Sequence, residues 1–107
     1  VMIKVQGEFL IGIDGVKTFV VQPLTAGAAM DALENAAVEH GDGVSLMRVR
    51  PYEYAHMVTV NDVPLTVKQI LGLITQDYDI LNRVAGELQK KLIAPTQEKT
   101  KPVKAST

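Results

Sequence analysis

The sequence predicts an α+β fold in which an N-terminal β-hairpin packs with about three helices, the last of them rich in leucine. Three observations predict this fold. Apolar residues alternate with polar ones between Ile3 and Gln22, which is the two-residue period of strands. A capping threonine and small apolar residues follow from Thr25 to Glu39. Apolar residues then recur at spacings of three and four between Tyr78 and Leu92, as on one face of a helix.

The size and composition of the chain limit its class. With 107 residues it fits a single domain, expected to span residues 1–93, that buries roughly 65% of the surface its unfolded form exposes. It has no cysteine and a net charge of −1, so neither a disulfide framework nor a general attraction to nucleic acid is expected. No apolar run approaches the roughly 20 residues that span a bilayer, and the N-terminus lacks the layout of a signal peptide. We therefore expect a soluble intracellular protein with no membrane or nucleic-acid partner.

The dipeptide Asp14-Gly15 predicts the turn of the hairpin, because both central residues of a type I′ turn need positive φ. With this two-residue turn Phe9 faces Val20 on one side of the hairpin, and Leu10 faces Phe19 on the other. A three-residue loop ending in a Gly15 bulge would instead pair Phe9 with Phe19. We expect the two-residue turn, and hence apolar pairs on both faces.

An alanine-rich helix is expected after the hairpin, from a Thr25 cap to about Glu39, with Gly41 ending it in the left-handed conformation. Its inner face is expected to carry Ala26, Ala29, Met30, Leu33, Ala36 and Ala37. The next stretch, residues 44–57, fits neither period. Pro51 there either interrupts a strand or begins a short helix over residues 52–57.

The second half of the chain carries clearer signals. A short extended segment is expected at Val58-Thr59-Val60, with a turn after it at Asn61-Asp62. Thr66 and Gln69 have the spacing of a capping box, which predicts a short helix over residues 67–74. A last helix follows from Thr75, with its apolar stripe on Tyr78, Leu81, Val84, Ala85, Leu88 and Leu92. Residues 94–107 contain two prolines and several lysines, and we expect them to form a disordered polar tail.

Residues with catalytic or metal-binding chemistry are few. His40 and His56 have no acidic residue at ligand spacing on a common helix face, so we expect no metal site and no catalytic histidine. Asp77 and Asp79 point away from each other on a helix and are expected to be a first-turn charge and a solvated residue rather than a carboxylate pair. The sequence therefore predicts neither an enzyme nor a cofactor.

Three segments of the chain carry a family resemblance. They are Arg48-Val49-Arg50-Pro51-Tyr52-Glu53, Asp62-Val63-Pro64-Leu65 and Leu73-Ile74-Thr75-Gln76-Asp77-Tyr78-Asp79-Ile80-Leu81. With the alanine-rich helix before them and the leucine-rich helix after them, they resemble the tail assembly chaperones of Mu-like contractile-tailed bacteriophages and prophages. The likeness runs from about Val16 to Leu92.

The resemblance implies a non-enzymatic protein of the host bacterial cytoplasm that takes part in virion morphogenesis. Such a chaperone holds the tape measure protein before the tail tube polymerises around it. In many such families a programmed frameshift also makes a longer form from the same start, with an extra C-terminal domain. The implied partners are thus the tape measure protein, further copies of the chain in a homo-oligomer, and a longer form of itself.

Six apolar residues are the expected partner-binding residues: Leu10, Phe19, Tyr78, Leu81, Leu88 and Leu92. The hairpin face with Leu10 and Phe19 is expected to bind another copy of the chain, and the end of the last helix to bind the client. Two alternatives remain at this point. The same stripe could be the core of a small homo-oligomeric structural or interaction protein, or Arg48, Arg50 and the lysine-bearing tail could belong to a phage nucleic-acid-binding regulator.

Overall fold

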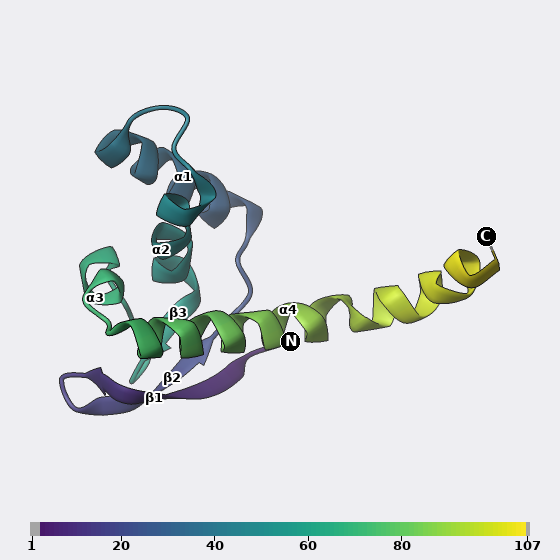
Figure 1. Cartoon of the computed structure of the whole chain (residues 1–107), viewed down its shortest axis with the longest axis horizontal. Helices are drawn as coiled ribbons and strands as arrows, with labels where there is room; N and C mark the ends of the chain where they lie inside the picture. The colour runs from purple at the N-terminus through teal and green to yellow at the C-terminus, as the bar shows by residue number, and fades with distance from the viewer. Residues whose placement is uncertain (1–2, 107) are drawn as a thin grey trace.

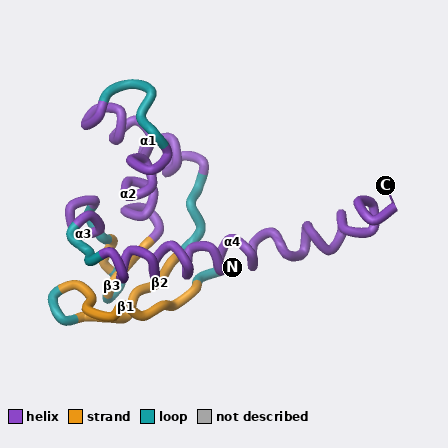
Figure 2. The backbone as a smooth tube through the Cα atoms, in the orientation of Figure 1, coloured by secondary structure: helices purple, strands orange, loops and turns teal. Residues whose placement is uncertain are grey.

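The computed structural model describes the backbone of residues 3–106 and the side chains of residues 3–92, and it has the predicted α+β architecture (Figure 1). A four-stranded antiparallel sheet has the strand order β1-β2-β3-β4. The helix α4 lies along this sheet, whereas α1 and α2 stand to one side of it (Figures 1 and 2). The elements in chain order are β1 (Val5–Ile13), β2 (Val16–Val21), α1 (Ala26–His40), α2 (Leu46–Met57), β3 (Val58–Val60), β4 (Val63–Pro64), α3 (Val67–Leu71) and α4 (Thr75–Ser106).

The turn between β1 and β2 is the predicted one, but the strand register is not. Asp14 and Gly15 have φ values of 50° and 80°, and Ile13 pairs with Val16. Farther from the turn the register shifts, so that Gly7 pairs with Phe19. The predicted pairing of Leu10 with Phe19 is therefore wrong, and so is that of Phe9 with Val20.

The shift arises where β1 bulges toward the start of α4. The backbone N–H of Leu10 donates to Asp77 Oδ1 at 2.6 Å, and those of Ile11 and Gly12 donate to Asp77 Oδ2 at 3.1 and 3.0 Å. Asp77 lies in the first turn of α4 as predicted, and it is 0% exposed, whereas Asp79 is exposed as predicted. Three donors replace the water that the carboxylate loses on burial.

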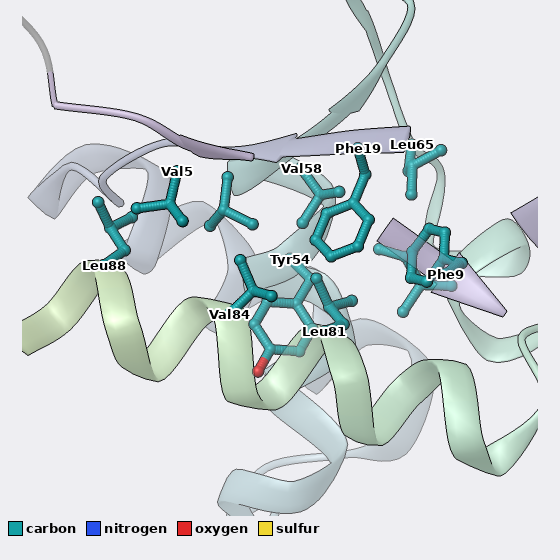
Figure 3. Close-up of a cluster of buried hydrophobic side chains, with 11 residues drawn as sticks. Val5, Phe9, Phe19, Tyr54, Val58, Leu65, Leu81, Val84 and Leu88 are labelled. Atoms are coloured by element: carbon teal, nitrogen blue, oxygen red, sulfur yellow. The ribbon is translucent and has the colours of Figure 1, made fainter. Parts of the chain in front are cut away.

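The main core lies between the sheet and α4 (Figure 3). Phe9 and Phe19 stack there with ring centroids 4.2 Å apart, because the shifted register turns both rings toward α4. The predicted helical stripe is confirmed as a core face by the burial of Leu81, Val84 and Leu88. The buried members of this core are Val5, Phe9, Phe19, Val21, Tyr54, Val58, Leu65, Ile70, Leu81, Val84 and Leu88.

A second and smaller core lies between α1 and α2, and consists of Ala32, Ala36, Val49 and Tyr52. Thr25 caps α1 as predicted, since its Oγ1 accepts from the Ala28 N–H at 3.1 Å. The predicted inner face is wrong for Ala26, Met30 and Leu33, which are exposed. α1 packs closely only on α2, so a narrow strip of small residues is enough to make its contact.

The helix α2 differs from both alternatives for residues 44–57. It begins at Leu46 after Ser45 and continues through Pro51 to Met57. Proline removes one intrahelical hydrogen bond, which normally disfavours a helix interior. Here Val49, Tyr52 and Tyr54 are buried on either side of Pro51, so the packing of α2 on two cores offsets the lost bond.

The remaining elements follow the local signals closely. The short strand β3 and the turn at Asn61 and Asp62 are confirmed, with φ values of 53° and 64° in the turn. The capping box of Thr66 and Gln69 is present, but α3 ends at Leu71 rather than near residue 74.

α4 is the longest helix of the described chain. Its helical backbone continues through residues 94–106, where the composition predicts a disordered tail. A helix that has already formed can be extended residue by residue without a new nucleation step. The prediction from composition did not take this into account. The side chains of residues 93–107 lie outside the described part, so the domain boundary at residue 93 stays a prediction. Within the described part of the chain, no helix combines the length and apolar character needed to cross a membrane.

Candidate functional site

Two neighbouring stripes on α4 have different surroundings. One stripe contains Asp77, Leu81, Val84 and Leu88 and is buried against the sheet. The other contains Tyr78, Asn82, Ala85, Gln89 and Leu92, which recur at spacings of three and four. This second stripe faces a series of surface hollows, and two of its members, Tyr78 and Ala85, also pack against the main core. It is the floor of the candidate site.

The helix α2 forms the opposite wall. Met47, Arg50, Tyr54 and Met57 recur along one side of α2 at spacings of three and four, and all of them line these hollows. Leu46 and Met47 stand at the start of this wall and are 76% and 85% exposed. Such large apolar side chains in water are the clearest sign of a binding surface in this region.

Three hollows lie one after another between the two helices, and neighbouring hollows share lining residues. The first, of about 290 Å³, lies beside α3 and is lined by Leu71, Met47 and Tyr78 among others. The second, of about 380 Å³, shares Met47 and Tyr78 with the first. The third, of about 560 Å³, shares Arg50 and Asn82 with the second and extends to Leu92. Together they form one depression, called here the α2–α4 groove.

Two pairs of polar groups line the α2–α4 groove. The Tyr54 hydroxyl donates to Asn82 Oδ1, and burial raises the pKa of Tyr54 above 10.0, so the hydroxyl remains protonated at neutral pH. Arg50 Nε lies 3.3 Å from Glu53 Oε1. The groove therefore combines apolar walls with one ion pair whose net charge is zero. It suits an apolar partner better than a charged one.

The predicted partner-binding residues are distributed between this groove, the core and the hairpin. Tyr78 and Leu92 line the groove, and Leu92 is 36% exposed. Leu81 and Phe19 are fully buried in the main core, and Leu88 is buried at its edge beneath the third hollow. Leu10 is exposed on the β1 bulge, and does not line the groove. The expected joint surface of Leu10 and Phe19 therefore does not form.

Several residues of the groove were not predicted. Leu46 and Met47 belong to the stretch that fitted neither period, and their only signal is that two large apolar residues follow the capping position Ser45. Gly86 gives a signal of another kind, since it interrupts a strong helical pattern. Both signals mark a position in the chain, but neither shows which helix faces that position in the fold.

A fourth hollow, of about 790 Å³, separates the end of α1 from α3. Its lining is mixed, with Glu39, His40 and Lys68 beside Val38 and Leu71. It lies beside the small α1–α2 core, against which Val67 of α3 also packs, and it shares only Leu71 with the α2–α4 groove. We interpret it as a gap left by loose packing rather than as a binding site.

The histidines and arginines do not assemble into a reactive group. His40 lies near the start of α2, with its Nδ1 3.4 Å from Arg48 Nη1, whereas His56 is exposed in the last turn of that helix. Among the residues with described side chains, no three His, Asp or Glu come together in a way that could hold a metal ion. The described residues thus offer a surface for contact.

Comparison with known proteins adds no relative. No protein-family model, no curated protein and no solved structure matches the chain.

Proposed function

We propose that this chain is a non-enzymatic chaperone of phage tail assembly that binds apolar helical segments of the tape measure protein in the host cytoplasm. The α2–α4 groove, with Leu46 and Met47 exposed at its start, is the observation that carries the proposal. The resemblance of three segments to Mu-like tail assembly chaperones supplies the identity of the client. Arg50 and Tyr78, which belong to two of those segments, both line the groove.

The chemistry of the groove suits a client with many similar segments. Methionine has a flexible and polarisable side chain, so Met47 can adapt to different apolar partners. Weak contacts of this kind can be released one by one when tube subunits compete for the client. Leu10 and Ile11 are also exposed, outside the groove, and would allow the client or another copy to make additional contacts.

Co-expression with the tape measure protein of the same phage or prophage tests the proposal. We expect the parent chain to keep the tape measure protein in the soluble fraction. Met47→Asp places a charge in the groove and should abolish this effect, whereas Met30→Asp makes the same change on the exposed side of α1 and should retain it. A tape measure protein that stays insoluble with the parent chain would show that the proposed function is wrong.

Self-association has its own support, because Leu10 and Ile11 are adjacent, exposed and located on the edge strand β1. The backbone N–H groups of both residues donate to Asp77, so contact with another chain here would use their exposed apolar side chains. The proposed homo-oligomer, or a pairing with a longer frameshifted form, would use this edge rather than Phe19. Sedimentation of the parent and of Leu10→Asp tests it, with a monomeric parent as the contrary result.

The nucleic-acid-binding alternative gains no support from Arg50, whose charge is paired with Glu53.

A further inference from the structure

Gly86 has no explanation within the single chain. It lies in the middle of the packed half of α4, where glycine is the poorest helix former after proline. A Cβ atom built on Gly86 meets nothing within 4 Å, so neither a close neighbour nor a positive φ requires glycine there. Gly7 provides the contrast, because a Cβ at that position would lie 2.4 Å from the Phe19 ring.

Gly86 also lies on the floor of the third hollow, next to Ala85 and opposite Met57. A glycine and an alanine together expose the backbone of α4 at this point, and they allow another backbone to approach closely. From Tyr78 to Leu92 the groove follows about 14 residues of helix, a length of about 21 Å. A helix of four turns has the same length.

The charges of the groove restrict the partner further. Arg50 and Glu53 are paired, and the other polar residues of the third hollow, Asn82 and Gln89, are neutral. A partner stripe that carried a net charge would have to compete with the Arg50–Glu53 ion pair for an opposite charge and would lose its own hydration. The complementary partner surface is therefore uncharged and apolar.

We propose that the α2–α4 groove binds one amphipathic helix of about four turns from another protein, whose uncharged apolar stripe lies against α4 and whose backbone comes closest at Gly86. This inference rests on the proposed function and adds to it the form of the client segment. The partner helix contacts the groove through side chains at positions i, i+4, i+7 and i+11. Its charged residues face away from the groove into water.

The test uses a fluorescein-labelled peptide of about 15 residues, with leucines at i, i+4, i+7, i+11 and i+14 and with lysine and glutamate elsewhere. Fluorescence anisotropy with the full chain should show binding of this peptide. A control peptide with glutamine in place of each leucine keeps helix propensity and should not bind. Equal binding of both peptides would overturn the proposal.

Gly86→Leu should fill the groove and lower the affinity for the leucine peptide by about tenfold or more. Gly27→Leu is the matched control, since a Cβ at Gly27 in α1 also meets nothing within 4 Å and Gly27 does not line the groove. It should bind within about twofold of the parent. Both variants should melt at or above the temperature of the parent, because each replaces a helical glycine in open space. Unchanged affinity in Gly86→Leu, equal weakening in Gly27→Leu, or a lower melting temperature of Gly86→Leu would overturn the inference.

Three further outcomes bear on this inference and on the proposed function. If Gly86→Leu still keeps the tape measure protein soluble as well as the parent does, the function stands and the groove is not the helix site. If the parent binds the peptide but leaves the tape measure protein insoluble, the helix site stands and the proposed client is wrong. If Gly86→Leu converts an oligomeric parent into a monomer and neither binds the peptide, the occupant is a second copy and the inference fails.

Discussion

At the scale of single residues, Asp77 determines more of the structure than any other polar side chain with a described position. Its carboxylate joins the first turn of α4 to the bulge of β1 through three backbone N–H groups. The helix N-terminus also favours its negative charge. Gly12 completes the arrangement, since it has a φ of 84° and a Cβ there would lie 2.2 Å from the Val16 carbonyl oxygen. Only glycine fits this point of the bulge.

Asp77→Asn should therefore destabilise the chain by about 2–3 kcal/mol, the contribution of one or two hydrogen bonds to a charged group. An amide keeps one acceptor oxygen but turns its NH₂ group toward backbone donors. Asp79→Asn is the matched control, because Asp79 lies two residues away on the exposed side of the same turn and should change stability by less than about 0.5 kcal/mol. Urea unfolding of the three proteins measures the difference. Equal stability of the two variants would contradict the role assigned to Asp77.

The same site predicts a dependence of stability on pH. Burial by itself would raise the pKa of Asp77, but the N–H groups of Gly12, Leu10 and Ile11, together with Lys17, lower it below its usual 3.8. A lowered pKa in the folded state stabilises the fold above the unfolded pKa, and this stabilisation is lost as the pH falls through the folded pKa. Unfolding free energies measured from about pH 6 to pH 2 should fall more steeply for the parent than for Asp77→Asn. Parallel curves would be the contrary result.

At the scale of elements, the predictable features are those with causes near in sequence. The turn at Asp14-Gly15, the Thr25 cap, the capping box at Thr66 and the stripe of α4 each depend on residues within one or two turns. The hairpin register depends on Asp77, which is 65 to 67 residues from its three donors. No local rule could include that contact, so the sequence predicted the turn and missed the shift beyond it.

The candidate site was predictable only on one side for a related reason. Tyr78 and Leu92 belong to a regular helical stripe, so they could be named in advance. The facing wall is α2, whose apolar residues divide between two cores and the groove and therefore follow no single period. Pro51 further obscured the helix. A groove between two elements can be predicted from sequence only when both of those elements can themselves be predicted.

At the scale of the whole molecule, the two cores are unequal. The main core holds eleven buried residues from the sheet, α2, the segment before α3, α3 and α4, whereas the second holds four, of which two are alanines. Alanine buries little apolar surface, and each square ångström contributes only about 25 cal/mol. Tyr54 anchors α2 in the main core, but α1 contributes only Ala32 and Ala36 to any core. The attachment of α1 is thus the weakest in the described fold.

We therefore expect α1 to open in a local unfolding event well below the free energy of global unfolding. Native-state hydrogen exchange followed by mass spectrometry should show less protection in residues 26–40 than in β2 or in residues 77–88 of α4. Ala36→Gly weakens α1 by about 1 kcal/mol or more and should speed exchange there while leaving β2 unchanged. Leu88→Ala removes about 2–5 kcal/mol from the main core and should speed exchange in β2 as well. If Ala36→Gly speeds exchange equally in α1 and β2, the two cores unfold as one cooperative unit, and α1 is held by contacts stronger than its two buried alanines can supply.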